Sequence, residues 1–280
     1  TTAIAATFRS ARGLALGITL SGTAAAQAIV PPLVTWLIDT VGWRSTYVWL
    51  GCGWGSLTML LSIFFLRVEH SGPMHEQTRN APTYGLTRTE ALRNSALHRI
   101  GLATFIMITV TIGLLIHKIA ILTAIGVSPI RAAWIVSLSG LAGIAGKLVT
   151  GFLLDRYSPT WTGGITLAVT AVGFLLLLGD TQSEGIVILA MVILGYAAGT
   201  ALQVGSYLTI QHAGMRNFGS IYGVLTSLVA MGSGIGPLLA GISFDLAGNY
   251  TPFLMAGAVG SLISSLLIWS IPPSPDWQSE

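Results

Sequence analysis

The stretch Gly13–Gly51 reads GLALGITLSGTAAAQAIVPPLVTWLIDTVGWRSTYVWLG, and it returns 206 residues later, without a gap, as Gly219–Gly257, GSIYGVLTSLVAMGSGIGPLLAGISFDLAGNYTPFLMAG. Ten of the 39 aligned positions are identical. Each copy begins with spaced glycines, continues as an apolar run broken by Pro, and ends with Asp, Gly and a second apolar run. A repeat of this length in an apolar chain is typical of membrane proteins built from two related halves. The shared order of features favours common structure over a chance match of Gly-rich segments.

The composition indicates that lipid is the solvent for which this chain is built. Apolar residues make up 52% and charged residues 8% of the 280 positions, and the mean hydropathy is +0.76. A soluble domain carries roughly 25% charged residues. The single cysteine excludes a disulfide within the chain, and no basic cluster points to nucleic acid. Metal-binding, nucleophile-elbow and phosphate-loop motifs are also missing, so we expect neither a cofactor nor enzymatic activity.

Eight segments are long and apolar enough to cross a membrane, which takes about 20 residues. We expect all of them to be helices, because lipid offers the backbone no hydrogen-bond partners. They cover residues 14–38, 45–66, 100–122, 130–154, 161–179, 185–207, 219–244 and 251–271. The repeat pairs the first span with the seventh, which implies a unit of six spans. The expected fold is therefore an all-α membrane helix bundle with eight transmembrane helices present of twelve.

The long polar connection, residues 67–98, marks the expected boundary between the halves. We predict that residues 1–66 are the last two helices of an N-terminal bundle and that 99–280 form a complete six-helix C-terminal bundle. The missing N-terminal helices of the same protein are then expected partners of this chain. Orientation follows the positive-inside rule. One side of the membrane carries nine arginines and the other carries two, which places both chain termini and the connection in the cytoplasm, at the plasma (inner) membrane.

Lys147 is the charged residue placed deepest in the expected spans. It lies eight residues before Asp155, which marks the end of its span. That spacing corresponds to about 12 Å, close to the middle of a hydrocarbon core of about 30 Å. A cation at this depth can bind an anionic substrate. The other interpretation is a structural lysine that pairs with a carbonyl or reaches toward Asp155 and the interface.

His117 and Lys118 are neighbours near the outer end of another span. Adjacent helical residues point about 100° apart, so at most one of them can face a central cavity. His117 is a candidate for binding substrate or a proton, since its ordinary pKa is near working pH. It can equally be a hydrogen-bonded histidine at the interface. We expect Lys118 to extend toward the outer membrane surface.

The string GFLLDR, residues 151–156, closes the span that holds Lys147. Gly151 suits a close helix contact, and Asp155 with Arg156 lies at the membrane edge. The pair is either an ordinary capping and topology signal or a gate in which Asp155 holds a neighbouring helix. Gly236 and Pro237, in a Gly-rich run of the span 219–244, are interpreted as a packing and hinge element.

Isolated polar residues also occur inside spans. Tyr196 and Gln203 are seven residues apart and would share one face of a helix, and Gln27 lies in the first span. They either line a polar path for substrate or hold helices together by hydrogen bonds.

Taken together, these motifs resemble the major facilitator superfamily, in its monocarboxylate-transporter-like and oxalate–formate-exchanger-like branch. The resemblance covers nearly the whole chain and rests on RGLALG (12–17), GWR (42–44), His117, GKLVTG (146–151), DR (155–156), FGSIYG (218–223), GP (236–237) and DLAGNY (245–250). It implies a proton-linked symporter or an exchanger of small carboxylates that works by rocking two six-helix halves. In the branch, a cation four residues before the motif glycine is linked to anion binding, and Lys147 holds that position before Gly151.

The sequence therefore predicts a secondary active transporter of a small organic anion, embedded in the lipid bilayer, with a coupled proton as a further partner. The main alternative is an exporter of lipophilic or drug-like solutes, and the alternative of another class is a membrane-embedded enzyme or receptor subunit. The expected substrate-binding residues are Lys147, His117, Tyr196, Gln203 and Gln27, and the expected gating or structural residues are Asp155, Arg156, Gly151, Gly236 and Pro237.

Overall fold

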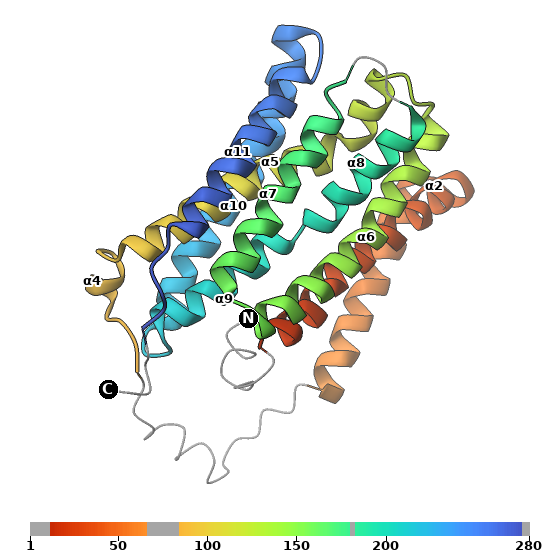
Figure 1. Ribbon diagram of the computed structural model, residues 1–280. Helices are drawn as coiled ribbons and strands as arrows, with labels where there is room; N and C mark the ends of the chain where they lie inside the picture. The colour runs from red at the N-terminus through yellow and green to blue at the C-terminus, as the bar shows by residue number, and fades with distance from the viewer. Residues whose placement is uncertain (1–11, 66–83, 180–182, 276–280) are drawn as a thin grey trace. The chain divides into compact units, whose positions relative to one another are not determined.

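The computed structural model describes residues 12–65, 84–179 and 183–275. The chain divides into two compact units, one of Thr1–Ala25 with Tyr84–Glu280 and one of Ala26–Thr83. Apart from one isolated bridge between Gly85 and Gly214, the regular structure of the described residues is helical. The helices are α2 (Arg12–Phe65), α4 (Arg88–Ala91), α5 (Ser95–Ala124), α6 (Pro129–Arg156), α7 (Pro159–Leu176), α8 (Glu184–Ala197), α9 (Thr200–Ala213), α10 (Phe218–Ala247) and α11 (Thr251–Trp269) (Figure 1).

Seven helical segments in the described part of the chain are long and apolar enough to cross a membrane. They are Thr40–Phe64, Ser95–Ala124, Pro129–Arg156, Pro159–Leu176, Glu184–Ala213, Phe218–Ala247 and Thr251–Trp269. A shorter apolar helical segment, Gly13–Ala26, lies where the sequence predicts the first span. The prediction of an all-α membrane protein is confirmed.

Two glycines at matching positions of the sequence repeat both take a positive φ. Gly42 interrupts α2 with a φ of 76°, and its repeat partner Gly248 ends α10 with a φ of 68°. Each lies three residues after the Asp of its copy. Positive φ is open to glycine without the steric cost that a side chain brings. Both copies therefore place glycine where the helix is interrupted or ends, although ψ is 159° at Gly42 and 4° at Gly248.

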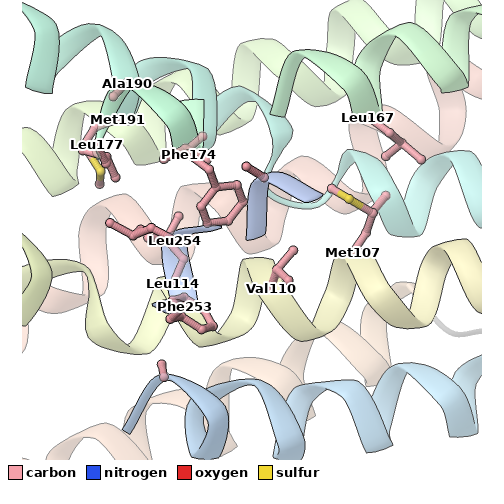
Figure 2. Packing of buried hydrophobic residues seen from close by; sticks show 14 of the residues in the cluster. Met107, Val110, Leu114, Leu167, Phe174, Leu177, Ala190, Met191, Phe253 and Leu254 are labelled. Carbon is pink, nitrogen blue, oxygen red and sulfur yellow. The ribbon is translucent and has the colours of Figure 1, made fainter. Parts of the chain in front are cut away.

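Close packing holds the larger unit together. Phe174 of α7 is fully buried among side chains from α5, α8 and α11 (Figure 2). Gly257 of α11 comes so near that a Cβ there would lie 2.6 Å from Cε1 of Phe174. In lipid, the hydrophobic effect does not drive helices together, so such van der Waals packing carries much of their association.

The glycine run of α10 packs against α5. A Cβ at Gly236 would lie 2.1 Å from the carbonyl oxygen of Thr109, and one at Gly113 would lie 2.7 Å from that of Gly236. The helix continues through Pro237 to Ala247. Gly236 thus has the packing role that the sequence suggests, and the hinge role of the run stays a prediction.

One membrane crossing is broken in its middle. The sequence predicts one continuous helix over residues 185–207, but α8 ends at Ala197 and α9 begins at Thr200. Gly199 forms the break with a φ of 91°. The seven-residue spacing of Tyr196 and Gln203 therefore does not place them on one face of a single helix. The run of small residues around Gly199 lets the backbone turn without a side-chain clash.

Candidate functional site: the contact between α2 and α6

Asp155, in the last turn of α6, caps the start of α2. Its Oδ1 accepts a hydrogen bond of 2.7 Å from the backbone N–H of Gly13, and its Oδ2 accepts one of 2.8 Å from that of Leu14. The first N–H groups of a helix have no partner within the helix and form its positive end. The carboxylate thus satisfies two donors and the local positive charge at once. Asp155 does hold a neighbouring helix, and its role as a gate stays a prediction.

Glycines bring the backbones of α2 and α6 into direct contact. A Cβ at Gly13 would lie 2.3 Å from the carbonyl oxygen of Gly151, and one at Gly151 would lie 2.4 Å from that of Gly13. One turn further on, a Cβ at Gly17 would lie 2.5 Å from the carbonyl oxygen of Lys147. Figure 1 shows the start of α2 running beside the end of α6. No side chain larger than hydrogen fits at these positions without moving a helix.

Lys147 is buried within this contact, with 4% of its surface exposed. Its Nζ donates to the carbonyl oxygen of Leu20 at 2.9 Å and to Oγ1 of Thr23 at 2.7 Å, both on α2. It therefore pairs with a carbonyl and a hydroxyl and does not reach Asp155. Among the described residues the one ion pair is the exposed pair Arg131–Glu184. Lys147 is thus a buried cation with no carboxylate partner in the part of the chain that the structure describes.

The break between α8 and α9 makes room for this lysine. A Cβ at Gly199 would lie 2.3 Å from Cε of Lys147 and 2.9 Å from its Nζ. No side chain caps the start of α9, whose first residue, Thr200, is fully buried. The stem of Lys147 therefore passes the end of α8 and the start of α9, where the terminal backbone N–H and C=O groups have no hydrogen-bond partner within their helix.

Gln203 of α9 joins the same contact. Its Nε2 donates to the carbonyl oxygens of Gly13, at 3.0 Å, and of Lys147, at 3.1 Å. Two carbonyl acceptors fix the orientation of the amide, because its oxygen would be repelled there. The Oε1 of Gln203 is the one fully buried side-chain polar atom in the described residues that has no hydrogen-bond partner. Tyr196 also contacts α6, through a bond of 3.1 Å between its hydroxyl and Oγ1 of Thr150.

His117 lies away from this contact. Its Nδ1 is 3.2 Å from the carbonyl oxygen of Gly113, and its ring centroid is 5.7 Å from that of Tyr250, in the turn before α11. Burial and the nearby charge of Asp245 raise the pKa of Tyr250, so the phenol beside His117 stays neutral. His117 therefore faces the α10–α11 turn, while Arg156 is exposed at the end of α6. The side chain of Gln27 lies outside the described residues.

The expected direction of Lys118 is wrong. Its side chain is 4% exposed and donates a hydrogen bond of 3.0 Å to Oγ of Ser139 on α6. It points into the bundle, and its neighbour His117 points toward another helix pair. His117 and Lys118 do point in different directions, as expected for adjacent helical residues, but the sequence does not show which of these two side chains faces inward.

Three residues that contact the buried lysines do not stand out in the sequence as site residues. They are Thr23 and Gly199, beside Lys147, and Ser139, beside Lys118. Hydroxyl residues in apolar helices usually bond their own helix, as Thr170 does here, and so do not stand out. Gly199 is one of 34 glycines. As for metals, no three His, Cys, Asp or Glu side chains converge in the described ranges.

Comparison with known protein families matches residues 100–280, more than half of the chain, to the Major Facilitator Superfamily. The chain belongs to the major facilitator superfamily. Similar proteins include monocarboxylate transporter 13 of Bos taurus, 27% identical over 269 residues, and monocarboxylate transporter 12 of Rattus norvegicus, 25% identical over 293 residues. Both matches cover 93% of this chain and 60% of the relative, so the chain spans about three-fifths of the length of these facilitators.

The similarity bears out the resemblance seen in the motifs. Monocarboxylate transporter 11 of Homo sapiens is also similar, at 26% identity over 274 residues, with 90% of this chain and 55% of the relative covered. The family and these relatives point to a transporter in a membrane and not to an enzyme.

Proposed function

We propose that this facilitator chain is part of a secondary active transporter that moves a small, monocarboxylate-like organic anion by alternating access. The observation that carries the proposal is Lys147, a buried cation in a membrane crossing with no carboxylate partner among the described residues. Charge inside a membrane protein is costly and usually serves a substrate or ion path. The relatives named monocarboxylate transporters support the same substrate class.

The geometry supplies a way for anion binding to move a helix. An ammonium group has three N–H donors, and Leu20 and Thr23 of α2 accept two of them. A carboxylate is a stronger acceptor for an ammonium than a carbonyl or a hydroxyl. One N–H of the amine is left for an anion, and a carboxylate that binds more closely than through this one donor competes with α2 for the amine. Substrate binding would weaken the α2–α6 contact, and Asp155, which caps the start of α2, would act as the gate that closes it again.

We assign a coupled proton, where one is carried, to His117. Gly143 lies one turn before Lys147, and a Cβ there would already be 3.1 Å from the carbonyl oxygen of Gly195. An Asp or Glu at position 143 would be a proton-binding group beside Lys147, but the packing leaves no room for such a side chain there. His117 lies in a crossing and is partly exposed, and imidazole is the side chain whose ordinary pKa is near working pH.

We further propose the arrangement of the whole protein. Six crossings follow residue 95, which supports residues 99–280 as the C-terminal bundle, with 67–98 as the connection and 1–66 as the end of the N-terminal bundle. The repeat and the greater length of the relatives support further helices of the same protein as partners. The distribution of arginines supports a plasma-membrane orientation with the connection in the cytoplasm.

Uptake into liposomes tests the substrate class. Full-length protein would be reconstituted and supplied with labelled lactate, pyruvate or oxalate, with and without a pH gradient and with and without anion inside. We expect saturable uptake of at least one monocarboxylate, and acceleration by an inward proton gradient if His117 carries a proton. Uptake of lipophilic cations with no saturable uptake of any of the three anions would contradict the proposal.

A further inference from the structure

Lys118 is a second buried cation, and its surroundings differ from those of Lys147. Its Nζ has one described hydrogen-bond partner, Oγ of Ser139, at 3.0 Å. That hydroxyl donates its own proton to the carbonyl oxygen of Val136 at 2.7 Å, so it can only accept from the lysine. No carbonyl oxygen and no carboxylate among the described residues accepts from this amine. Lys118 is therefore held in place but left with unmet donor capacity.

Lys118 contacts the face of α6 on which Lys147 lies. Ser139, Gly143 and Lys147 follow one another at intervals of four residues, so they lie in one row along that helix. The last turn of α8 covers the row, since a Cβ at Gly195 would lie 2.1 Å from the carbonyl oxygen of Ser139. Lys118 reaches the row at Ser139, about 12 Å along the axis from Lys147, at the end away from Asp155. Between the two amines the row bears Gly143, which packs against the carbonyl oxygen of Gly195, and no acidic side chain, so an anion would pass from Lys118 to Lys147 only when α8 moves from α6.

We infer that Lys118, positioned by Ser139, is a second carboxylate-binding residue, which receives the substrate anion at the end of α6 opposite Asp155 before Lys147 binds it. This inference rests on the proposed function. A lysine that only stabilises the bundle would be expected to have its donors met by backbone carbonyl oxygens, and no described carbonyl oxygen accepts from Lys118. A carboxylate is the partner that both supplies the missing acceptors and neutralises the buried charge.

Lys118→Met tests the inference, because it keeps the length and apolar stem of the side chain and removes the charge. The dissociation constant of labelled lactate would be measured on purified full-length protein, and KM by uptake into liposomes. We expect both to rise at least about tenfold, the loss typical of one hydrogen bond to a charged group. Lys118→Arg should stay within a few-fold of wild type. Arg131→Gln, which removes an exposed cation at the same end of α6, is the matched control and should change neither value.

Ser139→Ala keeps the inference testable if Lys118→Met does not fold. It leaves the amine but removes its support, and we expect a rise of about threefold in the dissociation constant, within the cost of one neutral hydrogen bond. Lactate affinity that stays at the wild-type value in the folded variants, while Lys147→Gln loses it, would overturn the role of Lys118 and leave the proposed function standing. A wild-type protein that binds no carboxylate would overturn both.

Discussion

Gln203 connects three helices through one side-chain amide, from α9 to the backbones of α2 and α6. Replacing it with Leu removes two hydrogen bonds from a fully buried site and keeps most of the volume. We expect a loss of about 1 kcal/mol of stability, or about 2–4 °C in the melting temperature. Thermal unfolding of the full-length protein followed by tryptophan fluorescence measures this. Ser233→Ala is the control, since that hydroxyl bonds within its own helix. An unchanged melting temperature in Gln203→Leu would show that the amide does not support the contact.

Asp155 gives the second prediction for a single residue. Asp155→Asn keeps one acceptor oxygen but removes the charge that faces the positive end of α2, which is worth about 0.3–1 kcal/mol and up to about 2 kcal/mol. We expect more molecules in which α2 has left α6. Spin labels at Thr19 and Trp161, both exposed, would report this as added longer distances in a Cys52→Ser background.

Glu184→Gln serves as the control for that experiment, because Glu184 is an exposed carboxylate that bonds Arg131. Its distance distribution should match that of the wild type. If Asp155→Asn gave the wild-type distribution too, the carboxylate would not be what keeps α2 on α6.

The sequence shows which single residues are unusual, but it does not show which atoms they contact. Depth along the helix and lack of a nearby acid single out Lys147. Its partners Leu20 and Thr23 belong to a helix 120 and more positions away, so their contact depends on packing between helices. Lys118 and His117 show the same limit. Two adjacent side chains point in different directions, and only the neighbouring helices determine which direction is inward.

At the scale of elements, the α2–α6 contact depends on glycine at chosen positions of one helix. Gly17→Ala would place a Cβ 2.5 Å from the carbonyl oxygen of Lys147, whereas at Gly22, five residues later in α2, no atom of the described residues lies within 4 Å. We expect Gly17→Ala to separate the helices and to lower the melting temperature. Gly22→Ala should be neutral or should stabilise by up to about 1 kcal/mol through its better helix propensity. Equal melting temperatures for the two variants would contradict this packing.

Element boundaries follow from the sequence where the signal is length and hydropathy. The expected spans from residue 100 onward match α5 to α11 closely, because lipid leaves an apolar run no alternative to a helix. The break between α8 and α9 is not predictable in this way. Gly199 is one glycine among many, so nothing in the sequence distinguishes it as the point of the break. Its left-handed turn lies against the stem of Lys147, which is a contact between helices.

At the scale of the whole molecule, the two copies of the repeat agree at one glycine and differ at others. Gly42 and Gly248 both have a positive φ, but the glycines at the start of each copy have different surroundings. Gly13 and Gly17 pack on α6, while a Cβ added at Gly219 or Gly223 would have no atom of the described residues within 4 Å. The repeat therefore predicts the order of helices and turns along the chain. It does not locate the candidate site, which lies where the first copy packs on α6.

The measurement that tests the account most directly is the KM for monocarboxylate uptake by full-length protein that carries Lys147→Gln. We compare it with Arg131→Gln, which removes an exposed cation outside the α2–α6 contact. We predict that Lys147→Gln raises KM at least about tenfold or abolishes saturable uptake, while the control stays within about threefold of wild type. Saturable uptake of every tested anion at the wild-type KM in Lys147→Gln would contradict it.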